Sequence, residues 1–221
     1  MAITSKILAK MDYFTGLDAD ELEAIKKYIA FEKRIEKGQT LLLEGDRSHY
    51  MYLIVSGAVK IFKKSVNGKE QILNIATTGE SLNDVSAFDG GECAMDMLAM
   101  TPVHLYTIKI DDIKDLFAKH PRIALNVAGV LAAKVRRDSS LVEVLSFDQV
   151  ISRLARLIIK QTDAGTGLLP LFTQQDLAAM VGTSRVVVNR SLRAMEEKGA
   201  IRLERRRIVI TDQEALKSLV S

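Results

Sequence analysis

Side chains that could contact nucleic acid gather near the C-terminal end of the chain, in a segment with helical periodicity. Arg185, Val186, Asn189 and Arg190 occupy neighbouring positions of such a helix. Guanidinium and amide groups are the ones that read base edges in the major groove of DNA. Apolar residues recur on the other face between Val188 and Met195. The spacing predicts a helix that packs through one face and presents the other to a groove.

The residues around this helix are of the types that begin and end helices. Thr173 with Asp176 predicts a capping box for a first helix, Gly182 predicts a turn, and Ser184 predicts the N-cap of the second helix. Gly199 predicts that the second helix ends in a left-handed conformation. An ordinary helical hairpin with a charged edge is the alternative, but this spacing is typical of a helix-turn-helix.

A basic hairpin is expected after the two helices. Residues Ile201 to Leu203 and Ile208 to Ile210 flank the charged stretch from Glu204 to Arg207 and predict two short strands. Three consecutive arginines in such a wing favour contact with phosphates. The predicted DNA-binding residues are Thr173, Gln174, Gln175, Ser184, Arg185, Val186, Asn189, Arg190, Arg205, Arg206 and Arg207.

The charge of the chain is divided unevenly. Residues 148–221 hold 12 Lys and Arg against 8 Asp and Glu, whereas residues 1–147 hold 19 against 20. The positive charge therefore lies with the predicted helix-turn-helix, as phosphate binding requires. No apolar run reaches membrane-spanning length, and Met1 to Met11 lacks the apolar core of a signal peptide. We therefore expect a cytoplasmic protein with no membrane partner.

The first part of the chain consists of brief β-rich runs separated by glycine turns. A short helix is expected over Leu17 to Ile29 with Asp18 as its cap, and Asn67-Gly68 predicts a hairpin turn. Short strands at this spacing indicate a small antiparallel roll or barrel. The expected strands are Thr40 to Leu43, Tyr50 to Ser56, Ala58 to Lys64, Glu70 to Ala76, Met95 to Met100 and Val103 to Ile110.

A long helix is expected from Pro121, whose fixed backbone angle suits a first helical turn. Apolar residues recur along it at alternating spacings of four and three, as in a coiled-coil seam, from Ala124 onwards. The stripe could pack on the roll of the same chain, but a helix that links two domains favours pairing with its twin. The predicted dimer interface comprises Ala128, Leu131, Val135, Asp138, Val142 and Leu145.

The order of parts, a roll, a long helix and a winged helix-turn-helix, resembles the cyclic-AMP receptor and fumarate-nitrate regulator (Crp/Fnr) family over essentially the whole chain. The matching segments are Glu36 to Gly38, Gly45-Asp46, Tyr52 to Gly57, Phe88 to Gly91, Phe147-Asp148, Arg153 to Ala155 and Gly182 to Arg190.

The resemblance implies an α+β fold: an antiparallel β-roll (double-stranded β-helix) like a cyclic-nucleotide-binding domain over residues 1–119, a dimerisation helix over 120–146, and a winged helix-turn-helix over 147–221. It also implies a homodimeric transcription regulator that binds palindromic double-stranded DNA and is gated by an effector in the roll. RNA polymerase would be a further partner of an activator. Nothing in the sequence predicts an enzyme, since no phosphate-binding glycine motif or nucleophile elbow is present.

The effector site departs from the family pattern. In cyclic-AMP-binding members a Gly-Glu pair holds the ribose and an Arg-Ser or Arg-Thr pair holds the phosphate, and here these positions are Asn83-Asp84 and Cys93-Ala94. Loss of the arginine removes the charge-assisted phosphate contact, so we expect an unknown small-molecule effector other than cyclic AMP. The candidate effector residues are Asn83, Asp84, Val85, Cys93, Ala94, Arg136, Arg137, Asp138 and Ser139.

Other sensing chemistries stay open. Haem would need a His, Met or Cys ligand, and His49, His104, His120 and Cys93 are available. Cys93 could also act as a redox switch, although no second cysteine exists to resolve it. A single cysteine excludes an iron-sulfur cluster held by four cysteines of the chain, and no metal site is predicted. The remaining alternative is a haem or ligand sensor whose output is a protein contact.

Overall fold

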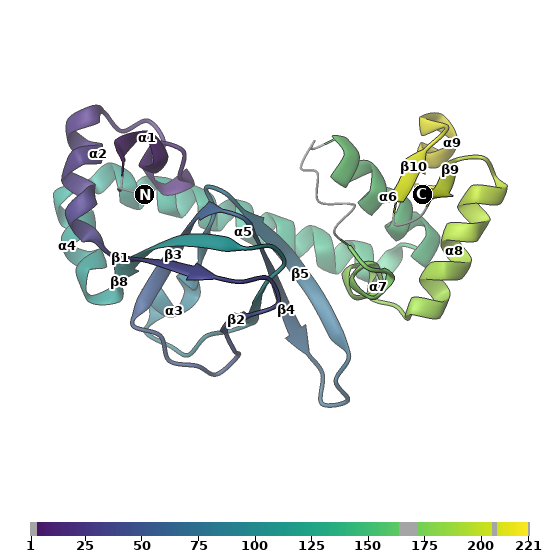
Figure 1. The fold of residues 1–221 in the computed structure, drawn as a ribbon, viewed down its shortest axis with the longest axis horizontal. Coiled ribbons are helices and arrows are strands. Elements are labelled where there is room, and N and C mark those ends of the chain that lie inside the picture. Colours follow the sequence, from purple (N-terminus) through teal and green to yellow (C-terminus); the bar gives the residue numbers. More distant parts are fainter. Residues whose placement is uncertain (1–3, 164–171, 205–206, 221) are drawn as a thin grey trace. The chain divides into compact units, whose positions relative to one another are not determined.

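The computed structural model describes residues 4–163, 172–204 and 207–220. The chain divides into two compact units. The first unit comprises residues 1–63 and 73–137, and the second comprises residues 64–72 and 138–221. The order of elements agrees with the expected fold (Figure 1). The domain boundaries expected at residues 119 and 146 stay predictions.

The first unit is built on two four-stranded antiparallel sheets. One sheet has the order β1-β8-β3-β6, with β1 Ile29–Ile35, β3 Tyr50–Ser56, β6 Ser81–Leu82 and β8 Val103–Lys109. The other has the order β2-β7-β4-β5, with β2 Thr40–Leu42, β4 Ala58–Lys64, β5 Glu70–Thr77 and β7 Asp96–Ala99. The six strands expected from the sequence are thus present: β3 and β4 have the predicted ends, and the other four differ by one residue at one or both ends.

Strand β3 contributes side chains to two separate hydrophobic cores. Successive side chains of a strand point to opposite faces, so Tyr52 and Ile54 enter the core shared with the second sheet, while Met51 and Leu53 enter another core. Because both faces are covered, the strand is an almost continuous apolar run rather than a polar-apolar alternation.

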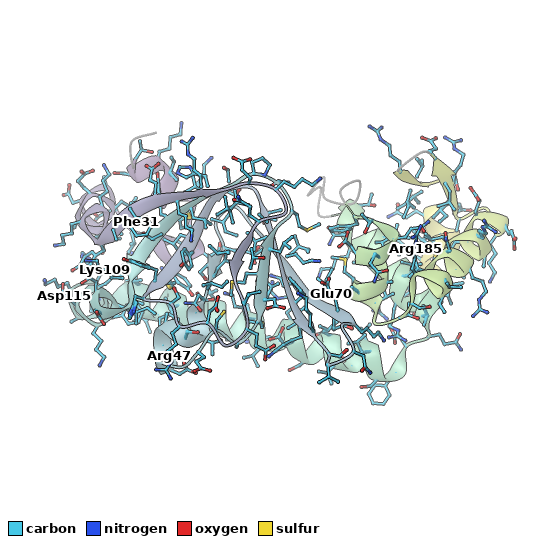
Figure 2. All side chains as sticks on the ribbon, turned by 60° about the horizontal axis from the view of Figure 1, so that its bottom comes forward. Phe31, Arg47, Glu70, Lys109, Asp115 and Arg185 are labelled. Carbon is cyan, nitrogen blue, oxygen red and sulfur yellow. The ribbon has the colours of Figure 1, made fainter. Side chains whose placement is uncertain are left out.

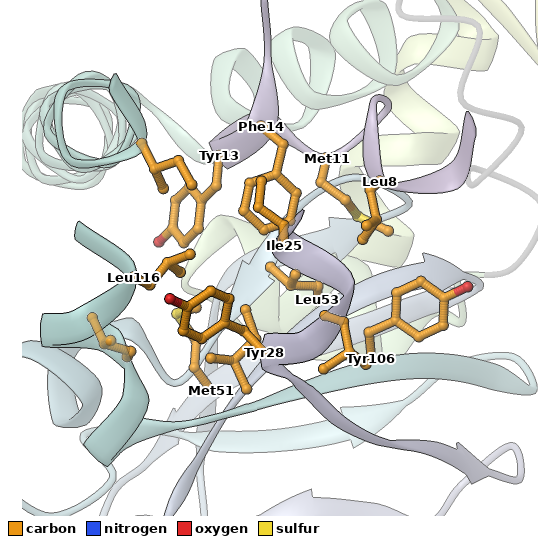
Figure 3. Close-up of a cluster of buried hydrophobic side chains, with 14 of the residues drawn as sticks. Leu8, Met11, Tyr13, Phe14, Ile25, Tyr28, Met51, Leu53, Tyr106 and Leu116 are labelled. Carbon is orange, nitrogen blue, oxygen red and sulfur yellow. The ribbon is translucent and has the colours of Figure 1, made fainter. Parts of the chain in front are cut away.

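The second face of this sheet is covered by helices. The covering elements are α1 Ser5–Leu8, η1 Asp12–Phe14, α2 Ala19–Ile25, η2 Lys26–Tyr28, η3 Ile110–Asp112, α4 Ile113–Lys119 and the start of α5 Pro121–Phe147. Figure 3 shows Tyr13, Phe14 and Ile25 packed with Leu53 and Tyr106 in this cluster. Burial of these large side chains fixes the N-terminal segment on the roll.

The helix expected over Leu17 to Ile29 is shorter than predicted. Asp18 forms the expected N-cap, with a capping box to Glu21, but α2 ends at Ile25. From Ile29 onwards the chain pairs with β8 as strand β1, which the sequence did not predict. Three of its residues, Glu32 to Arg34, are charged, as is common on an edge strand, so its hydrophobic signal is weak.

The second unit contains α6 Val150–Asp163, α7 Gln174–Val181, α8 Arg185–Glu197, β9 Ile201–Glu204, β10 Arg207–Ile210 and α9 Gln213–Lys217. The strands β9 and β10 form an antiparallel pair, the predicted wing. A single core joins α6, α7 and α8 through residues such as Leu154, Leu177 and Leu192. No helix in the described ranges is both long enough and apolar enough to span a membrane.

Candidate functional site

The helix-turn-helix begins and ends at the predicted residues. The Thr173 hydroxyl accepts from the Asp176 backbone N–H at 3.1 Å, and the Asp176 carboxylate accepts from the Thr173 N–H at 2.9 Å, which completes the capping box. Gly182 ends α7 with φ +67°, a conformation that favours glycine. The Ser184 hydroxyl then caps α8 at 3.3 Å from the Val187 N–H. The turn between α7 and α8 is therefore fixed by local chemistry.

One face of α8 is buried and the other is exposed. Val188, Leu192 and Met195 lie in the core of the second unit. Arg185 and Arg190 are exposed, and the Val186 side chain is 77% exposed although it is apolar. An exposed valine between arginines has no role in packing this unit, so its side chain is available to an external partner. Figure 2 shows Arg185 on this helix.

The first residue of α7 contacts two of the predicted DNA-binding side chains. Gln174 Nε2 donates to Asn189 Oδ1 at 2.7 Å, and Arg185 Nε donates to Gln174 Oε1 at 3.3 Å. Gln174 and Asn189 are half-buried, whereas Gln175 is exposed. The structure thus brings together Gln174, Arg185 and Asn189 across the two helices.

The wing is described only in part. Arg207 opens β10 and is exposed, while Arg202 on β9 is held by Glu204 at 2.8 Å. Arg205 and Arg206 lie outside the described residues. Of the other predicted DNA contacts, Thr173 and Ser184 are exposed caps of α7 and α8. Their hydroxyls accept the capping hydrogen bonds of these helices.

A second group of polar residues lies in the first unit, around α3 Asp84–Asp89. Asp84, predicted as an effector residue, is only 6% exposed. Its Oδ1 accepts from the Tyr13 hydroxyl at 2.6 Å, and its Oδ2 pairs with Lys134 Nζ. The Tyr13 pKa is raised, first because the phenol is buried and second because the Asp84 carboxylate is adjacent. Both oxygens of Asp84 are therefore satisfied within the chain.

Lys134 on α5 is held by three oxygen atoms. Besides Asp84, its ammonium donates to the Ser81 carbonyl and to the Ser81 hydroxyl, each at 3.2 Å. An ammonium has three N–H donors, so these acceptors match its full capacity. We call Tyr13, Ser81, Asp84 and Lys134 the Asp84 cluster. It ties α5 to the roll, together with Asn126, whose side chain donates to the Tyr13 carbonyl at 3.0 Å.

The neighbouring effector candidates are placed less uniformly. Asn83 is buried in a left-handed conformation with φ +65°, and its side-chain oxygen has no hydrogen-bond partner among the described residues. Val85 is exposed. Arg137 lies 3.6 Å from Glu80, while Arg136, Asp138 and Ser139 are exposed on α5. The structure thus joins Asp84 to α5 through Lys134, which the sequence analysis did not single out.

Cys93 and Ala94 stand where the phosphate-holding pair was expected. Cys93 is 2% exposed, and burial raises the pKa of its thiol. The thiol donates to the Met95 carbonyl at 3.2 Å. A buried, protonated thiol offers no charge to a phosphate.

The candidate haem ligands come from separate elements. His104 on β8 lies 2.9 Å from the Glu32 carboxylate, His49 is exposed before β3, and His120 is half-buried between α4 and α5. The described residues contain no group of three His, Cys, Asp or Glu side chains that could hold a metal ion.

The predicted seam on α5 divides into two kinds of residue. Val135 and Val142 are each 64% exposed, and Ala128 and Asp138 are exposed as well. Leu131 is half-buried against the core of the first unit. Val135 and Val142 are thus the exposed large apolar side chains of the predicted seam, and the seam itself stays a prediction.

Comparison with known families matches both units. Residues 32–120 match the family model described as a cyclic nucleotide-binding domain, and residues 152–219 match the model described as a Crp-like helix-turn-helix domain. The first range includes the roll with Asp84 and Cys93, and the second includes α7, α8 and the wing.

Whole-chain comparisons agree. The chain is 31% identical over 191 residues to the cyclic AMP receptor protein of Thermus thermophilus, over 86% of this chain and 88% of that protein. It is 29% identical over 218 residues to a CRP-like cAMP-activated global transcriptional regulator of Mycobacterium tuberculosis, over 96% of this chain and 97% of that protein. The solved structure of the c-di-GMP-responsive global regulator CLP of Xanthomonas campestris superposes with a TM-score of 0.78 at 20% identity, over 87% of this chain and 99% of that one, which shows a shared fold.

Proposed function

Because the chain belongs to the Crp/Fnr family of transcription regulators, we propose that it acts as a homodimer that reads a palindromic DNA site with paired α8 helices. The observation that carries this proposal is the exposed face of α8. Arg185, Val186 and Arg190 project from a helix whose other face is fully used in packing. A helix supported in this way can enter the major groove without disturbing its own unit.

The types of these side chains suggest what they read. Arg185 is suited to the two acceptors of guanine, O6 and N7. Val186 has no hydrogen-bonding group, so its role would be contact with a thymine methyl. Arg207 and the neighbouring Arg205 and Arg206 of the wing would bind phosphates, a contact that adds affinity without sequence preference.

We propose that the dimer forms along α5. Val135 and Val142 would be buried by the same residues of a second copy, which suits the self-complementary contact of a twofold dimer. A dimer would also carry two recognition helices, one for each half-site of a palindrome.

The effector in this proposal is a small molecule other than a cyclic nucleotide. Asp84, at the position of the ribose-binding carboxylate, already holds Tyr13 and Lys134, and neither Cys93 nor Ala94 supplies a cation for phosphate. Haem is the second candidate, with His120 and His49 as available ligands. We place the protein in the cytoplasm, with gene regulation and no enzymatic step as its role.

The test is DNA binding by the full chain, measured by fluorescence anisotropy on a duplex recovered from randomised DNA. Arg185→Ala should weaken binding by about 5- to 100-fold and relax the choice of guanine at one position of each half-site. Arg47→Ala is the control, because it removes the same charge from an exposed loop of the first unit, where the Arg47 side chain is 80% exposed and lies 3.3 Å from Glu92 (Figure 2). Equal losses for the two variants would contradict the assignment of α8.

A further inference from the structure

Gln174 does not lie on the recognition helix, yet it touches two of the side chains that α8 presents. It is the first residue of α7, its oxygen faces Arg185 Nε at 3.3 Å, and its nitrogen faces Asn189 Oδ1 at 2.7 Å. The contact with Asn189 is partly buried. The amide group of Gln174 is therefore used within the helix-turn-helix, where the sequence alone predicted a contact with DNA.

The direction of these hydrogen bonds is fixed by chemistry. A guanidinium only donates, so the group of Gln174 that faces Arg185 must be its oxygen. The opposite end of the Gln174 amide is then the NH2 group, which only donates. Asn189 must accept from it and must turn its own oxygen towards Gln174. The Arg185 guanidinium thus sets the orientation of the Asn189 amide through Gln174.

This orientation decides what Asn189 offers to a partner. Its oxygen is engaged by Gln174, and its NH2 group has no acceptor among the residues that the structure describes. An asparagine that recognises adenine accepts from N6 and donates to N7, which needs its oxygen at the base edge. Here the NH2 group is the part of the amide left for a base.

We infer that Gln174 is a positioning residue that fixes the base preference of Asn189: with the amide held this way, Asn189 donates to an acceptor on a base edge, such as O6 or N7 of guanine or O4 of thymine, and does not make the bidentate contact with adenine, which also uses its oxygen. The inference rests on the proposed entry of α8 into the major groove. It assigns part of the sequence readout to a residue of the preceding helix. It also predicts that the base preference of Asn189 depends on the hydrogen-bonding groups of residue 174. A side chain of the same size without these groups should not preserve that preference.

The substitution Gln174→Glu tests this polarity. A carboxylate accepts at both ends, so it keeps the hydrogen bond from Arg185 but can only accept from Asn189, whose amide must then turn its NH2 group inwards. Asn189 would present its oxygen, and the preferred base at its position should change from guanine or thymine to adenine or cytosine, which carry donors. Gln174→Met, which is similar in size and makes neither hydrogen bond, should lose the wild-type preference at this position, because the Asn189 amide is then free to present either end.

The experiment is selection of half-sites from randomised DNA by the wild type and each variant, with melting temperatures measured to confirm folding. We expect Gln174→Glu to alter preference at one base pair by at least about fivefold and Asn189→Ala to lose preference at the same pair. Gln175→Glu is the matched control, because Gln175 is the exposed neighbour, and it should weaken all sequences alike.

The inference would be overturned by a Gln174→Glu protein whose base preference does not differ from that of the wild type. If that protein also bound all sequences more weakly, as expected for Gln175→Glu, Gln174 would be a contact to the DNA backbone. Failure of the proposed function itself is distinguishable, since the wild type would then select no sequence at all.

Discussion

At α8, charged side chains extend from an exposed helix face, whereas in the roll the charged groups meet one another inside the protein. Arg185 and Arg190 are exposed and lie beside a valine that packing does not use. Asp84 and Lys134 are paired with each other and with Tyr13 and Ser81. The first arrangement leaves interactions for a partner, and the second uses its interactions to hold α5 on the roll.

The two sites should therefore respond differently to substitution. Removal of a charge from α8 should change binding with little effect on folding, because exposed charges contribute little to stability. Removal of one member of the Asp84 cluster should change stability, because it leaves a buried group without its counterion. Val135 and Val142 of α5 resemble the α8 residues in this respect, because both valines are largely exposed in the single chain.

The largest effect is expected for Val135→Glu. If Val135 lies in the interface of two copies, the substitution places a carboxylate from each copy in an apolar contact and should weaken the dimer by at least about 3 kcal/mol. Sedimentation at micromolar concentration should then show a monomer. Ala133→Glu is the control, because Ala133 is exposed and lies about half a turn away on the same helix. A dimer that survives Val135→Glu would remove Val135 from the interface.

The next effect is expected for Asp84→Ala. Tyr13 would lose its acceptor and Lys134 its counterion, so the free energy of unfolding should fall by about 3 kcal/mol, measured by chemical denaturation. Asp89→Ala removes an exposed acid from the same helix and should cost well below this.

A double substitution separates the attraction between Asp84 and Lys134 from the free-energy cost of burying the two charges. Asp84→Asn with Lys134→Met replaces both charges at similar size, and most of the lost stability should return because no charge is left buried and unpaired. If Asp84→Ala and Asp89→Ala destabilise the protein equally, the Asp84 cluster does not hold α5.

A smaller effect is expected at Cys93. Burial raises the pKa of its thiol, so at neutral pH the native protein should react with a thiol reagent at least about tenfold more slowly than the unfolded chain. The rate should rise with pH as the thiolate forms, with its midpoint above that of a free cysteine. Rapid labelling of the native protein at neutral pH would instead favour the redox alternative.

No effect is expected from cyclic AMP or cyclic GMP at near-physiological concentrations in calorimetry. Asp84 is occupied by Tyr13 and Lys134, and the phosphate-holding arginine is absent. The Thermus thermophilus relative, named a cyclic AMP receptor protein, is the positive control. Micromolar binding of either nucleotide would show that Cys93 and Ala94 were wrongly aligned with the phosphate site.

The sequence predicted the helix-turn-helix more fully than it predicted the roll. The start of α7 at Thr173, the turn at Gly182 and the cap at Ser184 depend on residues close together in the chain, and local rules describe such residues well. Strand β1 was missed because its charged edge residues hide its pairing with β8.

The Asp84 cluster could not be predicted by the same rules. Tyr13, Asp84 and Lys134 are separated by 71 and 50 positions, and only the folded roll brings them together. Gln174 was selected as a polar residue near the recognition helix, but its role follows from hydrogen bonds to residues 11 and 15 positions away. The seam of α5 stays a prediction, and periodicity alone did not indicate that Leu131 packs on the roll while Val135 is largely exposed.

Selection of half-sites by wild type and Val186→Glu is the most direct test that α8 reads bases with its exposed face. Glutamate can accept a hydrogen bond from cytosine, whereas valine can only contact a thymine methyl. We predict that the wild type prefers an A·T pair beside the guanine read by Arg185, and that Val186→Glu shifts this preference to G·C. Enrichment of the same half-site by both proteins would show that Val186 does not face the bases, and the placement of the recognition surface on α8 would be wrong.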